Sequence, residues 1–306
     1  MDKKLFSILA ILALCAGSAG SLPAQNRPAP KEKYHKQFIE NFSRPASRYF
    51  TPNLRSTGDD FRYFPATPSL SEKGSDIMLF RIDPADPAGA GRGPEIVSTR
   101  LSHFGTYSAR LRVPDVRRVQ PNVGAVVGYF TYLPHDNPDG LSEIDFEWLI
   151  ADPELIYIGT WTGHRPLQRV GRIVNLAEGT ILNTSYRRGD GPNLPLDGAQ
   201  SLPATVPVVE GYDASARFHT YGFDWLPDRL TWWILHPETG ERVVLWDYTG
   251  STPEFSGIPS NPTLYRLNFW HTDNWPAETN PASVEPPLYP YALEIDWMSY
   301  TPRDGN

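Results

Sequence analysis

The chain has 306 residues, a formal net charge of −7 at pH 7 and a single cysteine, Cys15. The length suits one large β domain, and the negative charge argues against nucleic acid, an anionic membrane surface or a polyanionic sugar as a partner. With one cysteine the fold cannot use an internal disulfide and must depend on a hydrophobic core. We expect a monomer.

The N-terminus has the pattern of a secretory signal peptide, with two lysines, an apolar run over residues 5–14 and then small residues. The run is too short to cross a bilayer as a helix, so no membrane insertion is expected. We expect cleavage after Ala24, which would remove residues 1–24, with cleavage after Gly20 as an alternative. The protein is then expected to be secreted to the extracellular space or the periplasm. Cys15 at the end of the run leaves a lipid anchor as an alternative.

Residues 25–58 are rich in proline, lysine and asparagine and predict a tether followed by an irregular segment that leads into the domain. The domain is predicted over residues 59–303, where short alternating runs are separated by Pro, Gly, Asp and Asn. Residues 107–113 alternate apolar and polar side chains, and residues 123–133 form a longer apolar run. Many short strands with turns between them predict a two-sheet β-sandwich.

Residues 142–150 carry the most informative pattern. Glu143, Asp145 and Glu147 alternate with large apolar residues, so in a strand the three carboxylates share one face. Three negative charges in a line repel one another, and a sequence selected only for stability would rarely place them there. A solvated acidic face is the alternative interpretation of this pattern.

The spacing of these carboxylates fits cleavage of a glycosidic bond with retention, which needs two carboxyl groups roughly 5–5.5 Å apart. Residues i and i+4 of one strand can reach this separation when their side chains lean together. Glu143 would be the nucleophile, and Glu147 would donate the proton. Asp145 would hydrogen-bond the nucleophile and help to hold the proton on Glu147, because nearby negative charge raises a carboxyl pKa.

Residues 165–217 interrupt the alternation with several arginines, prolines and glycines, and predict a long loop or insertion. Beyond them, apolar runs over residues 221–225 and 230–235 flank a turn in which Pro227 sets φ. This arrangement predicts a hairpin of two strands.

Four motifs in order along the chain resemble glycoside hydrolase family 16. They are Tyr129–Pro134 followed by Glu143–Glu147, then Phe218–Trp233, Asn268–Trp270 and Tyr291–Trp297. The closest resemblance is to the branch with an unbulged Glu-x-Asp-x-Glu strand, the lichenases and xyloglucan endotransglycosylases. It covers about residues 60–302 and implies an all-β fold. That fold is a β-jelly-roll sandwich of the concanavalin A-like lectin and glucanase type, in which a concave sheet forms the substrate cleft.

The resemblance also selects residues that would bind the sugar, since carbohydrate sites combine aromatic surfaces with short polar side chains. These candidates are Glu95, Phe130, Tyr132, Trp161, Asn268 and Trp270. Trp148, Trp225 and Trp297 are predicted instead to lie in the core.

Several positions depart from the family pattern. Val97 replaces an arginine, Leu141 replaces a tryptophan, and Gly159 or Thr160 takes the place of an asparagine in the cleft. These changes put lichenase specificity in doubt without affecting the chemistry. The chemistry requires no cofactor and predicts no metal ligands, although Asp296 matches a lichenase aspartate that helps to hold a structural calcium ion.

Together these features predict a secreted retaining endo-glycosidase that hydrolyses a β-linked polysaccharide by double displacement, with a β-glucan as the expected substrate. A transglycosylase would use the same site with a sugar acceptor in place of water. A lectin-like carbohydrate-binding protein is the alternative of another class, because jelly rolls also serve as lectins. A lectin needs no spaced pair of carboxylates.

Overall fold

The computed structural model describes residues 33–44, 46–53, 61–64, 71–72, 76–84, 93–134, 136, 140–250 and 257–303. The predicted signal peptide and the lipid-anchor alternative at Cys15 lie outside these residues. Within them, no helix has the length and apolar character that crossing a membrane would need.

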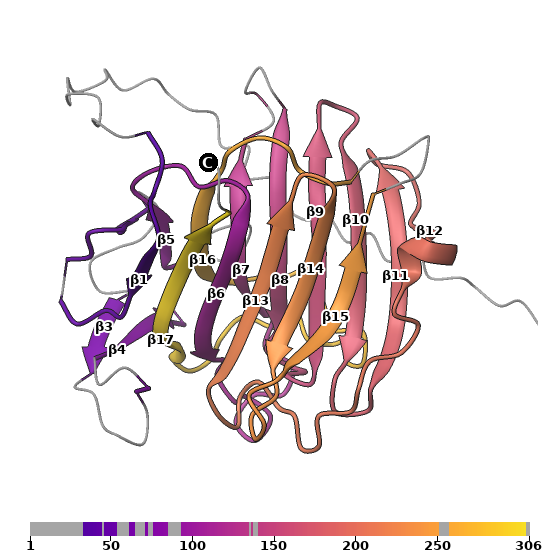
Figure 1. The fold of residues 1–306 in the computed structure, drawn as a ribbon. Helices are drawn as coiled ribbons and strands as arrows, with labels where there is room; N and C mark the ends of the chain where they lie inside the picture. Colours follow the sequence, from indigo (N-terminus) through magenta and orange to yellow (C-terminus); the bar gives the residue numbers. More distant parts are fainter. Residues whose placement is uncertain are drawn as a thin grey trace, which may run out of the picture.

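The described chain folds into two antiparallel β-sheets that lie face to face (Figure 1). In spatial order, the nine-stranded sheet contains β12 (Leu194–Pro195), β11 (Thr180–Arg188), β10 (Gln168–Asn175), β9 (Leu155–Gly163), β8 (Leu141–Leu149), β7 (Ala125–Leu133), β16 (Leu264–His271), β5 (Glu95–Ser98) and β2 (Phe50–Pro52). The eight-stranded sheet contains β15 (Arg242–Tyr248), β14 (Arg229–Leu235), β13 (His219–Leu226), β6 (Gly105–Arg112), β17 (Tyr291–Pro302), β4 (Ile77–Ile82) and β3 (Phe61–Phe64), and β1 (Phe38–Glu40) pairs with β17. A short 3₁₀ helix, η1 (Gly198–Ser201), follows β12. The predicted all-β jelly-roll sandwich is confirmed.

The core between the sheets is rich in aromatic rings. Phe146 and Trp148 of β8 point inward, and their rings lie 5.8 and 4.6 Å from the ring of Tyr221 on β13. Tyr129 of β7 packs against Phe223 of β13 at 5.7 Å. Because side chains alternate along a strand, each inward ring directs its sequence neighbours to the outer face of the sheet.

All three tryptophans predicted to lie in the core are buried. Trp148 and Trp225 have no exposed surface and belong to the core cluster between the sheets, whereas Trp297, 8% exposed, lies outside that cluster. The pairing of β17 with β6 shifts between Ile295 and Trp297, and this irregularity gives the inward position to Met298. Trp297 instead donates a hydrogen bond to Glu72 outside the core.

The predicted tether and irregular entry over residues 25–58 contain two short strands within the described residues 33–44 and 46–53. Residues 38–40 form β1 on the edge of β17, and residues 50–52 form β2 on the edge of β5. Phe38, Phe42 and Phe50 are buried in the core. These rings bury enough apolar surface to fix the segment to the domain, although the composition around them is polar.

The predicted long loop over residues 165–217 is also corrected. β10 and β11 pair over nearly their whole length and extend the nine-stranded sheet beyond β9, and β12 adds an edge strand. The pairing of β10 with β11 shifts at Ile173, which disturbs the periodicity of two.

Arg172 hides the strand pattern of β10 further, because a charged residue occupies an inward position between Val170 and Val174. The side chain is 1% exposed. Its guanidinium donates to the carbonyls of Pro203 and Leu245, at 2.9 and 3.1 Å. Burial of an arginine is tolerated here because these carbonyls replace water as hydrogen-bond acceptors.

Candidate active site

The site is built on β8, a central strand whose two faces differ completely. Ile144, Phe146 and Trp148 have no exposed surface, whereas Glu143 and Glu147 are half-buried on the other face, and Asp145 is buried between them. β8 is fixed on both sides by β7 and β9, and Trp232 donates to the main-chain carbonyl of Asp145. The predicted common face of the carboxylates is confirmed, and their chemical roles remain a prediction.

Register across the sheet arranges the outer face in three rows. The row of Glu143 runs through Tyr132, Trp161, Arg169 and Arg187. The row of Asp145 runs through Phe130, Gly159, Gly171 and Ser185, and the row of Glu147 runs through Gly128, Tyr157 and Ile173. Strands are ≈ 4.8 Å apart, so neighbours in a row touch.

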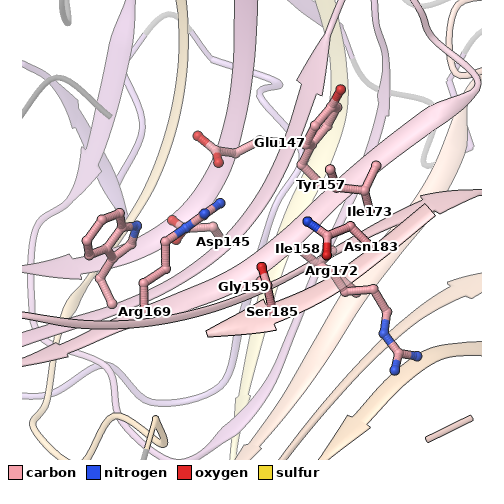
Figure 2. Close-up of a pocket in the computed structure, with 12 residues that line it drawn as sticks. Asp145, Glu147, Tyr157, Ile158, Gly159, Arg169, Arg172, Ile173, Asn183 and Ser185 are labelled. Atoms are coloured by element: carbon pink, nitrogen blue, oxygen red, sulfur yellow. The ribbon is translucent and has the colours of Figure 1, made fainter. Parts of the chain in front are cut away.

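A pocket opens beside the carboxylates over β9, β10 and β11 (Figure 2). Its lining includes Asp145 and Glu147 on one side, and Asn183 and Ser185 of β11 on the other. The space between them exists because the middle row carries glycine on both β9 and β10. Gly159, one of the two positions that could replace the asparagine of the family pattern, lines this hollow.

Arg169 is a site residue that the sequence analysis did not select, because it was assigned to a loop. Figure 2 shows its guanidinium directed toward the carboxylates of Asp145 and Glu147. A Cβ at Gly171 would lie 3.3 Å from Arg169 Nη2, so the glycine leaves room for the guanidinium to fold over β10. The alternation of Val170 and Val174 is the sequence signal that could have placed Arg169 on the outer face.

The three carboxyl groups all have raised pKa values. Burial is the main cause for each. For Glu143 the negative charge of Glu147 adds to the effect, and for Asp145 both glutamates add to it. The positive charge of Arg169 opposes the rise at all three groups. Since the groups interact, their protons are shared, and the resulting titration belongs to the triplet rather than to one residue.

The aromatic candidates lie on the same outer face but differ in exposure. Phe130 and Tyr132 are partly exposed beside β8. Trp161 is 8% exposed, because the guanidinium groups of Arg169 and Arg187 lie over its ring at 5.6 and 4.9 Å. The aromatic surface next to the carboxylates is therefore supplied mainly from β7.

The remaining candidates lie farther from the triplet. Trp270 is also 8% exposed and packs in a cluster with Trp275. Asn268 lies on β16, two strands from β8, and its buried Oδ1 has no hydrogen-bond partner among the described residues. Glu95 lies three strands away on β5, and its carboxylate forms an ion pair of 2.6 Å with Arg266. Asn268 lies directly opposite Gly128, which lies directly opposite Glu147, and a Cβ at Gly128 would lie 2.4 Å from Asn268 Oδ1. The amide of Asn268 therefore lies over Gly128, in the row of Glu147. The sugar-binding roles of Glu95, Asn268 and Trp270 stay predictions.

The calcium role of Asp296 stays a prediction. The carboxylate oxygens of Asp296 accept hydrogen bonds from Ser71, from the main-chain N–H of Glu72 and from Arg110, whose cation lies 2.5 Å away. Calcium needs six to eight oxygen ligands, and no group of three or more His, Cys, Asp or Glu residues suited to a metal occurs in the described part of the chain. The carboxylate is held by protein donors.

No protein-family model matches the chain. In sequence it is 28% identical to a β-glucanase of Paenibacillus polymyxa over 214 residues, which are 68% of this chain and 63% of the relative. It is 33% identical to a β-glucanase of Brevibacillus brevis over 213 residues, 68% of this chain and 60% of the relative. The chain thus spans less than two thirds of the length of these relatives. A β-glucanase structure from Bacillus licheniformis shares the fold, with a TM-score of 0.52, 18% identity, and coverage of 88% of this chain and 99% of that one.

Replacing Glu147 by glutamine should stabilise the protein at alkaline pH. Because the pKa of Glu147 is raised in the folded state, its ionised form opposes folding above that pKa. The penalty vanishes as the pH falls toward the unfolded value of about 4.3. We expect E147Q to melt above the wild type at pH 8 and close to it at pH 4, with roughly 2–4 °C for each 1 kcal/mol relieved. Circular dichroism melts check this, and equal shifts at both pH values would contradict it.

Arg169→Met should have the opposite effect. Without this cation the ionised triplet is less compensated, so we expect a lower melting temperature at pH 8, whereas at pH 4 the carboxyl groups are protonated and the loss should be small. Arg229→Met, which removes an exposed arginine from the other sheet, is the matched control. A loss of the same size at both pH values would mean that Arg169 acts only through packing.

Proposed function

We propose that this protein is a retaining glycoside hydrolase of family 16 that cleaves a β-glucan. The observation that carries the proposal is the position of Glu143 and Glu147 on one outer face of a central strand, beside a pocket. Similarity to bacterial β-glucanases over 68% of the chain supports it. Secretion belongs to the same proposal, since a polysaccharide substrate lies outside the cell.

In the proposed mechanism, Glu143 attacks the anomeric carbon while Glu147 protonates the oxygen that leaves. The glycosyl–enzyme ester then reacts with water, from which Glu147 removes a proton, and the ester oxygen returns to Glu143 as a carboxylate. Double displacement needs roughly 5–5.5 Å between the two carboxyl groups, a gap that two long side chains leaning over Asp145 can reach.

In this mechanism Glu143 must be ionised to attack, and Glu147 must be protonated to donate. Burial and mutual repulsion keep protons on the triplet at pH values where ordinary carboxyl groups have lost them. This supplies the proton that Glu147 must donate. The same surroundings also raise the pKa of Glu143, which must lose its proton before it can attack.

Substrate contacts are proposed to come first from Phe130 and Tyr132. Both rings are partly exposed on β7, and in register they lie directly opposite Asp145 and Glu143. An aromatic face packs against the apolar CH face of a sugar ring. A neutral glucan fits these surroundings, because the cations near the triplet already face carboxylates.

Glutamine variants of the two glutamates test the assignment. E147Q should lose at least 10²-fold in kcat on an unactivated glucan, since general acid–base catalysis typically contributes about 10²–10⁴-fold. It should retain more activity on an aryl glycoside, whose leaving group needs no proton. E143Q should be inactive on both. Glu238→Gln, at an exposed turn, is the matched control.

The substrates for this test are mixed-linkage glucan, laminarin, xyloglucan, galactan and chitosan, with products analysed by mass spectrometry and by NMR of the anomeric centre. Retained configuration and shorter chains are expected. Products longer than the starting oligosaccharide would identify a transglycosylase. Tight binding without turnover would identify a lectin, and wild-type activity in E143Q would refute the assignment of the nucleophile.

A further inference from the structure

Arg266 and Glu95 form a charged pair on the outer face of the nine-stranded sheet that the proposed mechanism does not use. Arg266 Nη1 lies 2.6 Å from Glu95 Oε1, and their side chains are only 16% and 11% exposed. The guanidinium carbon of Arg266 lies 5.1 Å from the centre of the Tyr132 ring. A partly buried arginine held on two sides is restricted in its orientation.

This orientation brings the cation toward Glu143. Arg266 on β16 lies directly opposite Phe130 on β7, and it leans along the strand to Tyr132. Tyr132 in turn lies directly opposite Glu143 on β8. Arg266 is therefore separated from the acidic row by one aromatic ring.

The charged groups around Glu143 come from several elements. On β8 itself, Asp145 and Glu147 are negative. Across β9, Arg169 on β10 is positive, and on the other side Arg266 is positive. Of these cations Arg266 has the larger effect on Glu143, whose pKa it lowers against the effect of burial. Tyr132 and Trp161, the direct neighbours in the row, are uncharged.

We propose that Arg266 is a positioning residue, fixed by Glu95 and Tyr132, whose positive charge favours the ionised form of Glu143 that nucleophilic attack requires. The inference rests on the proposed function, and it gives Glu95 a different role from the sugar ligand predicted above. Glu95 acts through Arg266. The Nε of Arg266 is buried without a hydrogen-bond partner among the described residues, so the ion pair with Glu95 leaves part of the guanidinium unsatisfied.

The pairing of β5 with β16 relates Arg266 to the arginine of the family pattern that is absent at position 97. Val97 stands where the family pattern has arginine, and Val97 on β5 lies directly opposite Arg266 on β16. A guanidinium at this place therefore comes from the adjacent strand instead of from position 97. Side chains of residues directly opposite on one face lie about 4.5–5.5 Å apart, close enough for one to take over the space of the other.

Arg266→Met tests the proposal through the pH dependence of kcat/KM. Loss of the cation should move the acidic limb to higher pH by about one unit, because an opposite charge nearby shifts a carboxyl pKa by roughly 1–3 units. At pH values below the pKa that defines the acidic limb, kcat/KM of R266M should be roughly tenfold lower than that of the wild type. On the plateau at higher pH the two values should be similar. Arg266→Lys should keep most of the wild-type profile, and Arg229→Met is the matched control.

Two further variants separate an electrostatic role from a structural one. Val97→Arg in the R266M protein returns a cation to the opposite strand and should move the limb back toward the wild-type position. Glu95→Gln should add little to R266M, because the two residues act as one unit. A sugar ligand at position 95 would instead raise KM further in the double variant.

Direct titration keeps this inference separate from the proposed function. Carboxyl ¹³C NMR of the labelled protein, with the Glu143 signal assigned by E143Q, should show a higher pKa for Glu143 in R266M than in the wild type. An unchanged titration, or a loss of kcat/KM equal at all pH values, would overturn the role of Arg266. A wild-type protein inactive on every glucan would overturn the proposed hydrolase. The NMR titration would still decide whether Arg266 affects the ionisation of Glu143.

Discussion

The opposition between the two faces of β8 is the constraint on which the rest of the site depends. Three adjacent carboxyl groups on one face repel one another and resist burial. On the other face Ile144, Phe146 and Trp148 are fully buried against the second sheet. Each fully buried apolar side chain contributes roughly 1.5–3 kcal/mol, which fixes the strand in a register that the acidic face alone would not favour.

Compensation for the acidic face comes from the neighbouring strands. Arg169 lies two strands from β8 on one side, and Arg266 lies two strands away on the other. Arg169 is directed toward Asp145 and Glu147, whereas Arg266 approaches Glu143 past Tyr132. The two ends of one acidic line thus meet different cations, and this asymmetry can give chemically identical glutamates different protonation states.

These cations also show where prediction from the sequence ends. The period of two over residues 142–150 was sufficient to predict β8, both of its faces and its acidic triplet. The partners of the triplet depend on register between strands that are distant in sequence, and no local pattern encodes that register. Position 266 follows position 143 by more than a hundred residues, yet the two lie within one set of neighbouring strands.

Local errors of prediction have local causes. An inward arginine at position 172 and a shift in pairing at Ile173 concealed β10, and a similar shift at Ile295 left the buried Trp297 outside the cluster between the sheets. In each case the backbone departs from strict alternation, and a periodicity of two then assigns side chains to the wrong face. The polar composition around Phe38 and Phe50 concealed two short edge strands for a different reason, since three buried rings outweigh their neighbours.

The packing of Trp161 bears on its predicted role as a sugar-binding residue. An exposed tryptophan would offer a platform for a sugar ring, but here two guanidinium groups lie over the indole, and 8% of the residue is exposed. Cation–π contact holds Arg169 in place more than it serves a ligand. Gly159 and Gly171 in the row of Asp145 carry no side chains, and both line the hollow beside Asp145. In the proposed hydrolase, a sugar at this end of the site would therefore meet the arginines that cover Trp161 and the polar side chains of β11.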